Sequence, residues 1–189
     1  TRGSGPASIQ GMATYSGIWW RPFLSLRRET TTQVCLDAGI TWWDDPHNVD
    51  ERFVRPRIRH KVMPVLEQHL GPGVAEALAR TGELLGRDRE ELDRQAWKLA
   101  HSIGDGVELG MIPAGMLNRV PVAISSRVVR IIVEESIGVS LSFHHTEQVL
   151  AFVTGAIRGT VVEIPEGRVE KHGDHYRVVP TSGVYRGEE

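Results

Sequence analysis

Apolar residues follow the 3.6-residue period of an amphipathic helix in two long stretches of the chain. In the first they fall at positions 74, 78, 85, 92, 96 and 99, and most of the positions between them are charged. In the second, residues 120–137, they repeat at the same spacing and leave one basic face. A helix is predicted over each stretch, and we expect the first to bridge two lobes.

Shorter helices are marked by residues that begin or end them. Residues 28–38 read as a helix because Gly39 suits the left-handed position that follows a helix end. Ser142 is a typical N-cap for a helix that continues to Gly155. In residues 48–70, Pro56 suits an early helix position and Pro64 limits how far that helix runs unkinked.

Strands are expected in two places. Residues 40–43 read as one short strand. Near the end of the chain, residues 161–164, 168–171 and 175–179 are separated by turn sequences, which is typical of a small antiparallel sheet. The expected fold class is therefore α+β and mostly helical.

Composition narrows the class of protein. The 189 residues, 40% of them apolar, suffice for one core or two small ones. A net charge of −2 means that any nucleic-acid contact must come from a local cluster of cations. Cys35 is the only cysteine, which excludes a disulfide framework and multi-cysteine zinc sites.

The same composition bears on location. No apolar run approaches the roughly 20 residues of a membrane-spanning helix, and the start of the chain has no apolar core of a secretion signal. We predict a cytoplasmic protein with no membrane contact. Because the chain opens with Thr1 and a glycine-rich turn, we expect it to be a piece of a longer protein.

The strongest chemical feature is a basic segment that follows the acidic stretch 44–50. It places five cations within ten residues: Arg52, Arg55, Arg57, Arg59 and Lys61. In a helix, like charges four residues apart cost roughly 0.2–0.5 kcal/mol per pair, so an anion should offset them. The candidates are the neighbouring aspartates, a nucleotide phosphate or an RNA backbone; a solvated face neutralised by nearby acids is the alternative.

Other features give weaker signals. The turn Arg2-Gly3-Ser4-Gly5 suits either a phosphate or an ordinary surface. The pairs Trp19-Trp20 and Trp42-Trp43 are expected to pack in a core rather than to stack on bases. Arg119, Arg127 and Arg130 form the basic face of the helix over 120–137 and are candidate RNA contacts. No metal site is predicted, because the histidines lack partners at a recognised spacing.

Seven short motifs occur in an order and spacing that resemble the tRNA(Ile)-lysidine synthetases. They are Arg2-Gly3-Ser4-Gly5, Gly11-Met12, Arg21-Pro22-Phe23-Leu24, Arg28-Glu29, Asp45-Pro46-His47-Asn48, Arg55-Pro56-Arg57-Ile58-Arg59 and Pro64-Val65-Leu66. The segment from the helix at 120 to the strand at 161–164 resembles, more loosely, the tRNA-binding domain of that family.

The resemblance implies a ligase of the PP-loop ATPase group. Such an enzyme uses ATP, with Mg²⁺, to adenylate the wobble cytidine of the isoleucine tRNA with a CAU anticodon. The amine of free lysine then displaces AMP, and codon reading changes from AUG to AUA. Whether the parent enzyme is a homodimer is left open.

The resemblance also implies three parts and their site residues. Residues 1–68 would be the C-terminal part of an α/β PP-loop ATPase domain, 69–103 a linking helical region, and 104–189 a helical tRNA-binding domain with a small antiparallel sheet. The residues expected to contact ATP phosphate or tRNA are Arg55, Arg59, Arg57 and Arg2. Those expected to support the site are Asp45, Asn48 and Asp50, with Asn48 or Asp50 capping the following helix. Further tRNA contacts are expected from Lys61, Arg127 and Arg130.

Three departures from the family pattern limit what this chain should do alone. His47 stands where the family usually has Ser, and Pro56 where it usually has Asn. The phosphate-binding loop S-G-G-x-D-S does not occur in these residues. We therefore expect that the chain alone neither binds ATP tightly nor makes lysidine. A stand-alone RNA-binding module is the alternative function; a thiolating PP-loop enzyme is disfavoured because such enzymes usually rely on several cysteines.

Overall fold

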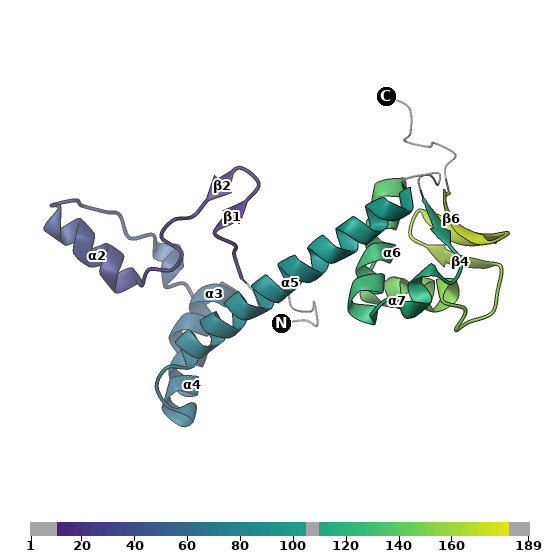
Figure 1. Ribbon diagram of the computed structural model, residues 1–189. Helices are drawn as coiled ribbons and strands as arrows, with labels where there is room; N and C mark the ends of the chain where they lie inside the picture. The colour runs from purple at the N-terminus through teal and green to yellow at the C-terminus, as the bar shows by residue number, and fades with distance from the viewer. Residues whose placement is uncertain (1–10, 105–109, 182–189) are drawn as a thin grey trace. The chain divides into compact units, whose positions relative to one another are not determined.

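The computed structural model describes residues 11–104 and 110–181. The described residues are mostly helical, with one two-stranded and one four-stranded antiparallel sheet (Figure 1). The chain divides into two compact units, Thr1–Arg87 and Asp88–Glu189, and the boundary falls within helix α5, Val74–Gly104. We call them the first and the second unit; the division of the chain at residues 68 and 103 stays a prediction.

The first unit begins with a hairpin of strands β1 (Tyr15–Ser16) and β2 (Trp19–Trp20). Helix α2 (Arg28–Asp37) ends where expected, and Gly39 takes the left-handed conformation with a φ of 67°. The strand expected at residues 40–43 is wrong. No described strand pairs with this segment, so it stays irregular until the 3₁₀-helix η1 (Pro46–Asn48).

The basic segment forms three short helical pieces. They are α3 (Val54–Arg57), the π-helix η2 (Ile58–Val62) and α4 (Met63–Leu70). Pro56 lies inside the first turn, as expected. Pro64 has no N–H to donate to the carbonyl of His60, and the helix widens to the π form in the turn before it.

The second unit packs helices beside the four-stranded sheet. Helix α6 (Val122–Ile137) contacts β6 (His175–Pro180), and α7 (Phe143–Val153) contacts β4 (Val161–Ile164) (Figure 1). The remaining elements are β3 (Met111–Pro113), the 3₁₀-helix η3 (Met116–Arg119) and β5 (Gly167–His172). The strand order is β3-β6-β5-β4. The three strands expected near the end of the chain are confirmed, and β3 was not predicted.

Apart from Pro56, the buried apolar side chains among the described residues belong to the second unit. They run from Ala96 on α5 to Val178 on β6, and include Val129 on α6 and Phe152 on α7. The Phe152 ring meets that of Tyr176 edge-on, with the ring centroids 4.9 Å apart. Ser142 caps α7 as expected, accepting a hydrogen bond from the His145 N–H. The second unit therefore has a closed hydrophobic core of its own.

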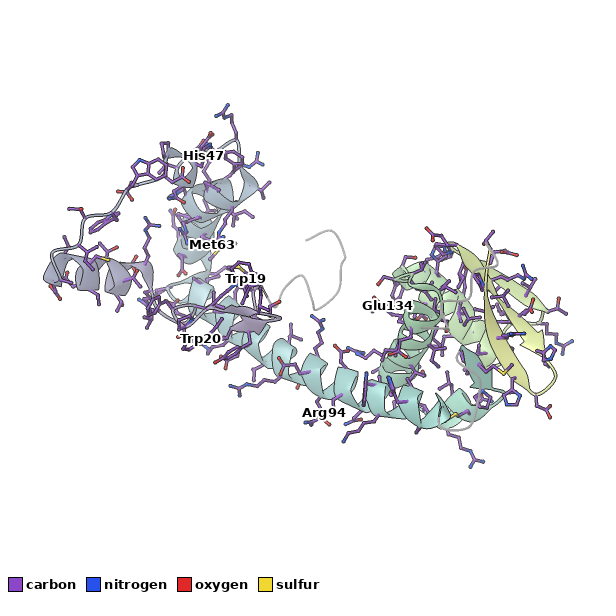
Figure 2. All side chains as sticks on the ribbon, turned by 90° about the horizontal axis from the view of Figure 1, so that it is seen from above. Trp19, Trp20, His47, Met63, Arg94 and Glu134 are labelled. Carbon is purple, nitrogen blue, oxygen red and sulfur yellow. The ribbon has the colours of Figure 1, made fainter. Side chains whose placement is uncertain are left out.

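The described residues of the first unit have many exposed apolar side chains and no such core. The side chains of Trp19 and Trp20 are labelled in Figure 2. Trp19 is 65% and Trp20 61% exposed, and Trp42 and Trp43 are 45% and 76% exposed. The expectation that these pairs pack in a core is therefore wrong for the described residues, because this unit contains no buried cluster to receive them. Large exposed apolar patches are typical of surfaces that bind a protein, a membrane or a ligand.

Candidate anion-binding site

A cavity of about 570 Å³ lies in the first unit between α2, η1 and the basic helical segment. None of its lining residues is acidic, and three of them are arginines. The lining residues are Phe23, Leu24, Leu26, Arg28, Thr31, His47, Asn48, Arg55, Pro56 and Arg59. The walls therefore favour an anion.

Two of the arginines are free to meet a ligand. Arg55 lies on α3 and Arg59 on η2, and within the described residues neither guanidinium forms an ion pair or a hydrogen bond. Arg57 is likewise without a described partner but does not line the cavity. Arg28 lines it from α2, and its Nη2 lies 3.3 Å from Asp44 Oδ1. Arg28 belongs to one of the seven motifs, but it was not predicted from the sequence as a site residue.

Carboxylates neutralise the other two cations of the basic segment. Arg52 Nη2 donates to Asp50 Oδ2 at 2.7 Å, and the pKa of Asp50 is lowered chiefly by hydrogen bonds from Arg52. Lys61 Nζ lies 2.5 Å from Glu51 Oε2. For Arg52 and Lys61 the structure therefore agrees with the alternative interpretation, a solvated face whose charges are neutralised by nearby acids. The phosphate interpretation therefore depends on Arg55 and Arg59.

Asp45 shapes the turn that leads into the site. Its Oδ1 accepts hydrogen bonds from the backbone N–H of His47 at 2.9 Å and from the ring Nδ1 at 2.8 Å. The backbone bond is the larger cause of the lowered pKa of Asp45, followed by the ring bond. The His47 ring meets Phe53 nearly edge-on, with centroids 5.4 Å apart. His60 Nε2 lies 3.2 Å from the carbonyl oxygen of Asn48.

The expectation that Asn48 or Asp50 caps the following helix is wrong. Helix α3 begins after Phe53, which makes no side-chain cap hydrogen bond. Asp50 instead accepts a hydrogen bond from the Arg52 N–H at 3.0 Å, and this bond closes a turn that ends one residue before Phe53. Asp45 caps η1, so the side-chain cap lies upstream of the position expected from the sequence.

The arginines of the second unit behave differently from one another. Arg127 Nε donates to Asp93 Oδ1 on α5 at 2.7 Å, and its Nη1 donates to the carbonyl of Ala123. Only 22% of this side chain is exposed, so Arg127 ties α6 to α5. Arg119 and Arg130 are exposed and have no ion pair within the described residues. Arg2 lies outside the described residues.

The described residues contain neither a candidate metal site nor a helix that could span a membrane. None of the groups of His, Cys, Asp and Glu side chains in the described ranges could hold a metal ion. Along the same residues, every helix is too short or too polar to cross a membrane.

Comparison with known proteins defines the class of this chain. Residues 1–66, which include the whole cavity, match the PP-loop domain family. Similar proteins extend the match into the second unit. The tRNA(Ile)-lysidine synthase of Leifsonia xyli subsp. xyli is 47% identical over 154 residues, which are 80% of this chain and 46% of that protein.

Two further relatives carry the same name. The tRNA(Ile)-lysidine synthase of Cutibacterium acnes is 39% identical over 171 residues, 89% of this chain and 51% of that protein. That of Rhodococcus erythropolis is 47% identical over 130 residues, 69% of this chain and 39% of that protein. This chain belongs to the tRNA(Ile)-lysidine synthase family. It spans about half the length of the curated relatives it matches, or less.

Proposed function

We propose that this chain is part of an ATP-dependent ligase that joins lysine to the wobble cytidine of the CAU-anticodon isoleucine tRNA. In this proposal the cavity of the first unit contributes phosphate contacts, made by Arg55 and Arg59. The observation that carries it is the lining, which has three arginines, one histidine and no acidic residue. Within the described residues, the guanidinium groups of Arg55 and Arg59 have no carboxylate partner. The complete enzyme acts in the cytoplasm on ATP with Mg²⁺, free lysine and tRNA.

Phosphate suits these side chains better than another anion. Two guanidinium groups four residues apart on a short helical segment repel each other, and an anion between them removes that repulsion. A guanidinium presents parallel N–H donors that match two phosphate oxygens. Both steps of lysidine formation develop charge on a phosphate group, which positioned cations stabilise.

We infer that the open apolar surface of the first unit is covered by the remainder of the PP-loop domain in the complete protein. The family match over residues 1–66 and the half-length coverage of the relatives support this inference. ATP would then be held mainly by that remainder. Alone, this chain is expected to bind ATP weakly and to make no lysidine.

The second unit is proposed to contact tRNA, with Arg130 and Arg119 as its available cations. Arg127 is a weaker candidate than the sequence suggests because Asp93 already holds it. The closed core of this unit also fits the alternative function, a stand-alone RNA-binding module, since such a module must fold without help. Activity of the complete reading frame separates the two functions.

Salt dependence of binding to isoleucine tRNA tests the cavity arginines. The variant Arg55→Gln/Arg59→Gln removes two unpaired charges, and the control Arg52→Gln/Lys61→Gln removes two charges that carboxylates already neutralise. Each phosphate contact contributes about 0.7 to 0.9 to the slope of log affinity against log salt. The first variant should lower the slope by roughly 1.5, and the control should leave it nearly unchanged.

A second arm of the experiment uses inorganic pyrophosphate in place of tRNA. If Arg55→Gln/Arg59→Gln weakens both ligands, the cavity recognises phosphate as such. If it weakens tRNA alone, the arginines contact the RNA backbone and not the nucleotide. Equal slopes for the two double variants would contradict the proposal.

A further inference from the structure

We propose that His47 is a pH-dependent ligand of the phosphate group bound in this cavity, donating a hydrogen bond from Nε2 when the ring is protonated. This inference rests on the proposed function of the cavity and adds a fourth cationic side chain to Arg28, Arg55 and Arg59.

The contact with Asp45 fixes which ring nitrogen is left for a ligand. An ionised carboxylate only accepts hydrogen bonds, so the Nδ1 atom 2.8 Å from Asp45 Oδ1 carries a hydrogen. In the neutral ring, Nε2 then has a lone pair, which repels a phosphate oxygen. Within the described residues Nε2 has no hydrogen-bond partner, so a proton taken up there is available to a ligand.

One further contact holds the ring, and the same aspartate also fixes the backbone of His47. Phe53 meets it nearly edge-on, and the backbone N–H of His47 donates to the same Asp45 oxygen as the ring. Figure 2 labels His47 on the segment that precedes α3. A ring fixed at two points loses little freedom when a ligand binds, which favours a direct contact over a transient one.

The charges around the ring decide what a bound phosphate does to it. Asp45 Oδ1 is in direct contact with the ring. Arg28, Arg55 and Arg59 line the same cavity as His47. A phosphate among these arginines offsets their charge, so binding of phosphate and uptake of a proton by His47 should reinforce each other.

A structural role alone is the competing explanation for this contact. The Asp45–His47 pair also caps η1, and a cap needs only the backbone N–H. If His47 only takes part in the cap, ligand affinity should not depend on its ring. The pH profile of binding therefore separates the two roles.

The test measures pyrophosphate affinity of the full chain by calorimetry at about pH 6 and about pH 8, which bracket histidine titration. The variant is His47→Ser, which removes the ring. The control is His60→Ser, since His60 is exposed and does not line the cavity. Protonation of pyrophosphate itself affects every protein alike, so the comparison is made between proteins.

The wild type and His60→Ser should gain affinity at the lower pH by roughly five- to tenfold relative to His47→Ser, which is the effect of one charge-assisted hydrogen bond at an exposed site. Asp45→Asn should reduce that gain, because the ring is no longer held. If His47→Ser keeps the wild-type pH profile, the inference is wrong and the arginine site stands. If the wild type binds no pyrophosphate at either pH, the nucleotide-phosphate role of the cavity fails and the inference fails with it.

Discussion

Matched truncations of two valines test whether the hydrophobic core belongs to the second unit alone. Val129 on α6 is 0% exposed within the core cluster, whereas Val34 on α2 is 60% exposed. Each change, Val129→Ala and Val34→Ala, removes the same two methyl groups. Only their surroundings differ, so the difference in stability reports the packing.

The magnitude follows from burial. Moving two buried carbon groups back to water costs roughly 1.5 kcal/mol, and the cavity left behind raises the cost to roughly 2–3 kcal/mol. At an exposed position the same truncation stays within about 0.5 kcal/mol of zero. For a unit of this size 1 kcal/mol shifts Tm by about 4–8 °C, so Val129→Ala should lower Tm by roughly 10 °C or more.

Hydrogen exchange on the full chain, read at peptides from α6 and β5, measures the second unit separately from the first. Val129→Ala should speed exchange in both peptides, and Val34→Ala should leave them unchanged. If Val34→Ala proves as costly as Val129→Ala in thermal unfolding, the first unit has a core of its own. The proposal that the remainder of a PP-loop domain covers its open surface would then be wrong.

Two more predictions concern single side chains. Because Arg127 is paired with Asp93, Arg127→Ala should destabilise the second unit by about 1 kcal/mol in chemical denaturation and leave the salt slope of tRNA binding unchanged. Arg130→Ala should lower that slope and leave the stability nearly unchanged. A lowered slope for Arg127→Ala would contradict this prediction. Glu67 accepts hydrogen bonds from the N–H groups of Ala75 and Gly73 at the start of α5, and the Ala75 bond is the main cause of its lowered pKa. The stability that ionised Glu67 gives to the start of α5 is therefore present above about pH 4.5 and lost as the pH falls further. In the wild type, hydrogen exchange at the start of α5 should speed up over this pH range. In Glu67→Gln, which has no carboxylate to protonate, the same pH change should have no such effect.

Local rules predicted the second unit well because its signals are local. A serine at an N-cap, apolar residues at helical spacing and two turn sequences each act over a few residues, and the helices and the three terminal strands formed where these signals place them. Strand β3 was missed because three residues carry little pattern. It is a strand only through its pairing with β6, more than 60 positions away along the chain.

The first unit shows where local rules fail. The Trp19-Trp20 and Trp42-Trp43 pairs are apolar enough for a core, yet burial needs a partner surface, which the described residues do not provide. The strand expected at residues 40–43 failed for the same reason, since a strand is defined by its neighbour. Both errors come from judging residues by their local pattern alone, because burial and strand pairing each need a partner surface that the local pattern does not reveal.

The candidate site shows a different limit, that of counting charges. Five cations in ten residues suggest one phosphate-binding surface, but acids on the N-terminal side of the segment neutralise Arg52 and Lys61. The residues left without carboxylate partners include Arg55 and Arg59, and these two line the cavity together with Arg28 from a separate helix. Sequence spacing identified the right segment because like charges four residues apart need an anion. It could not tell paired cations from free ones, because that depends on where the chain turns at Asp45 and Asp50. A substitution that removes the partner of Arg52, such as Asp50→Asn, should therefore free one more cation of the basic segment and steepen the salt dependence of tRNA binding.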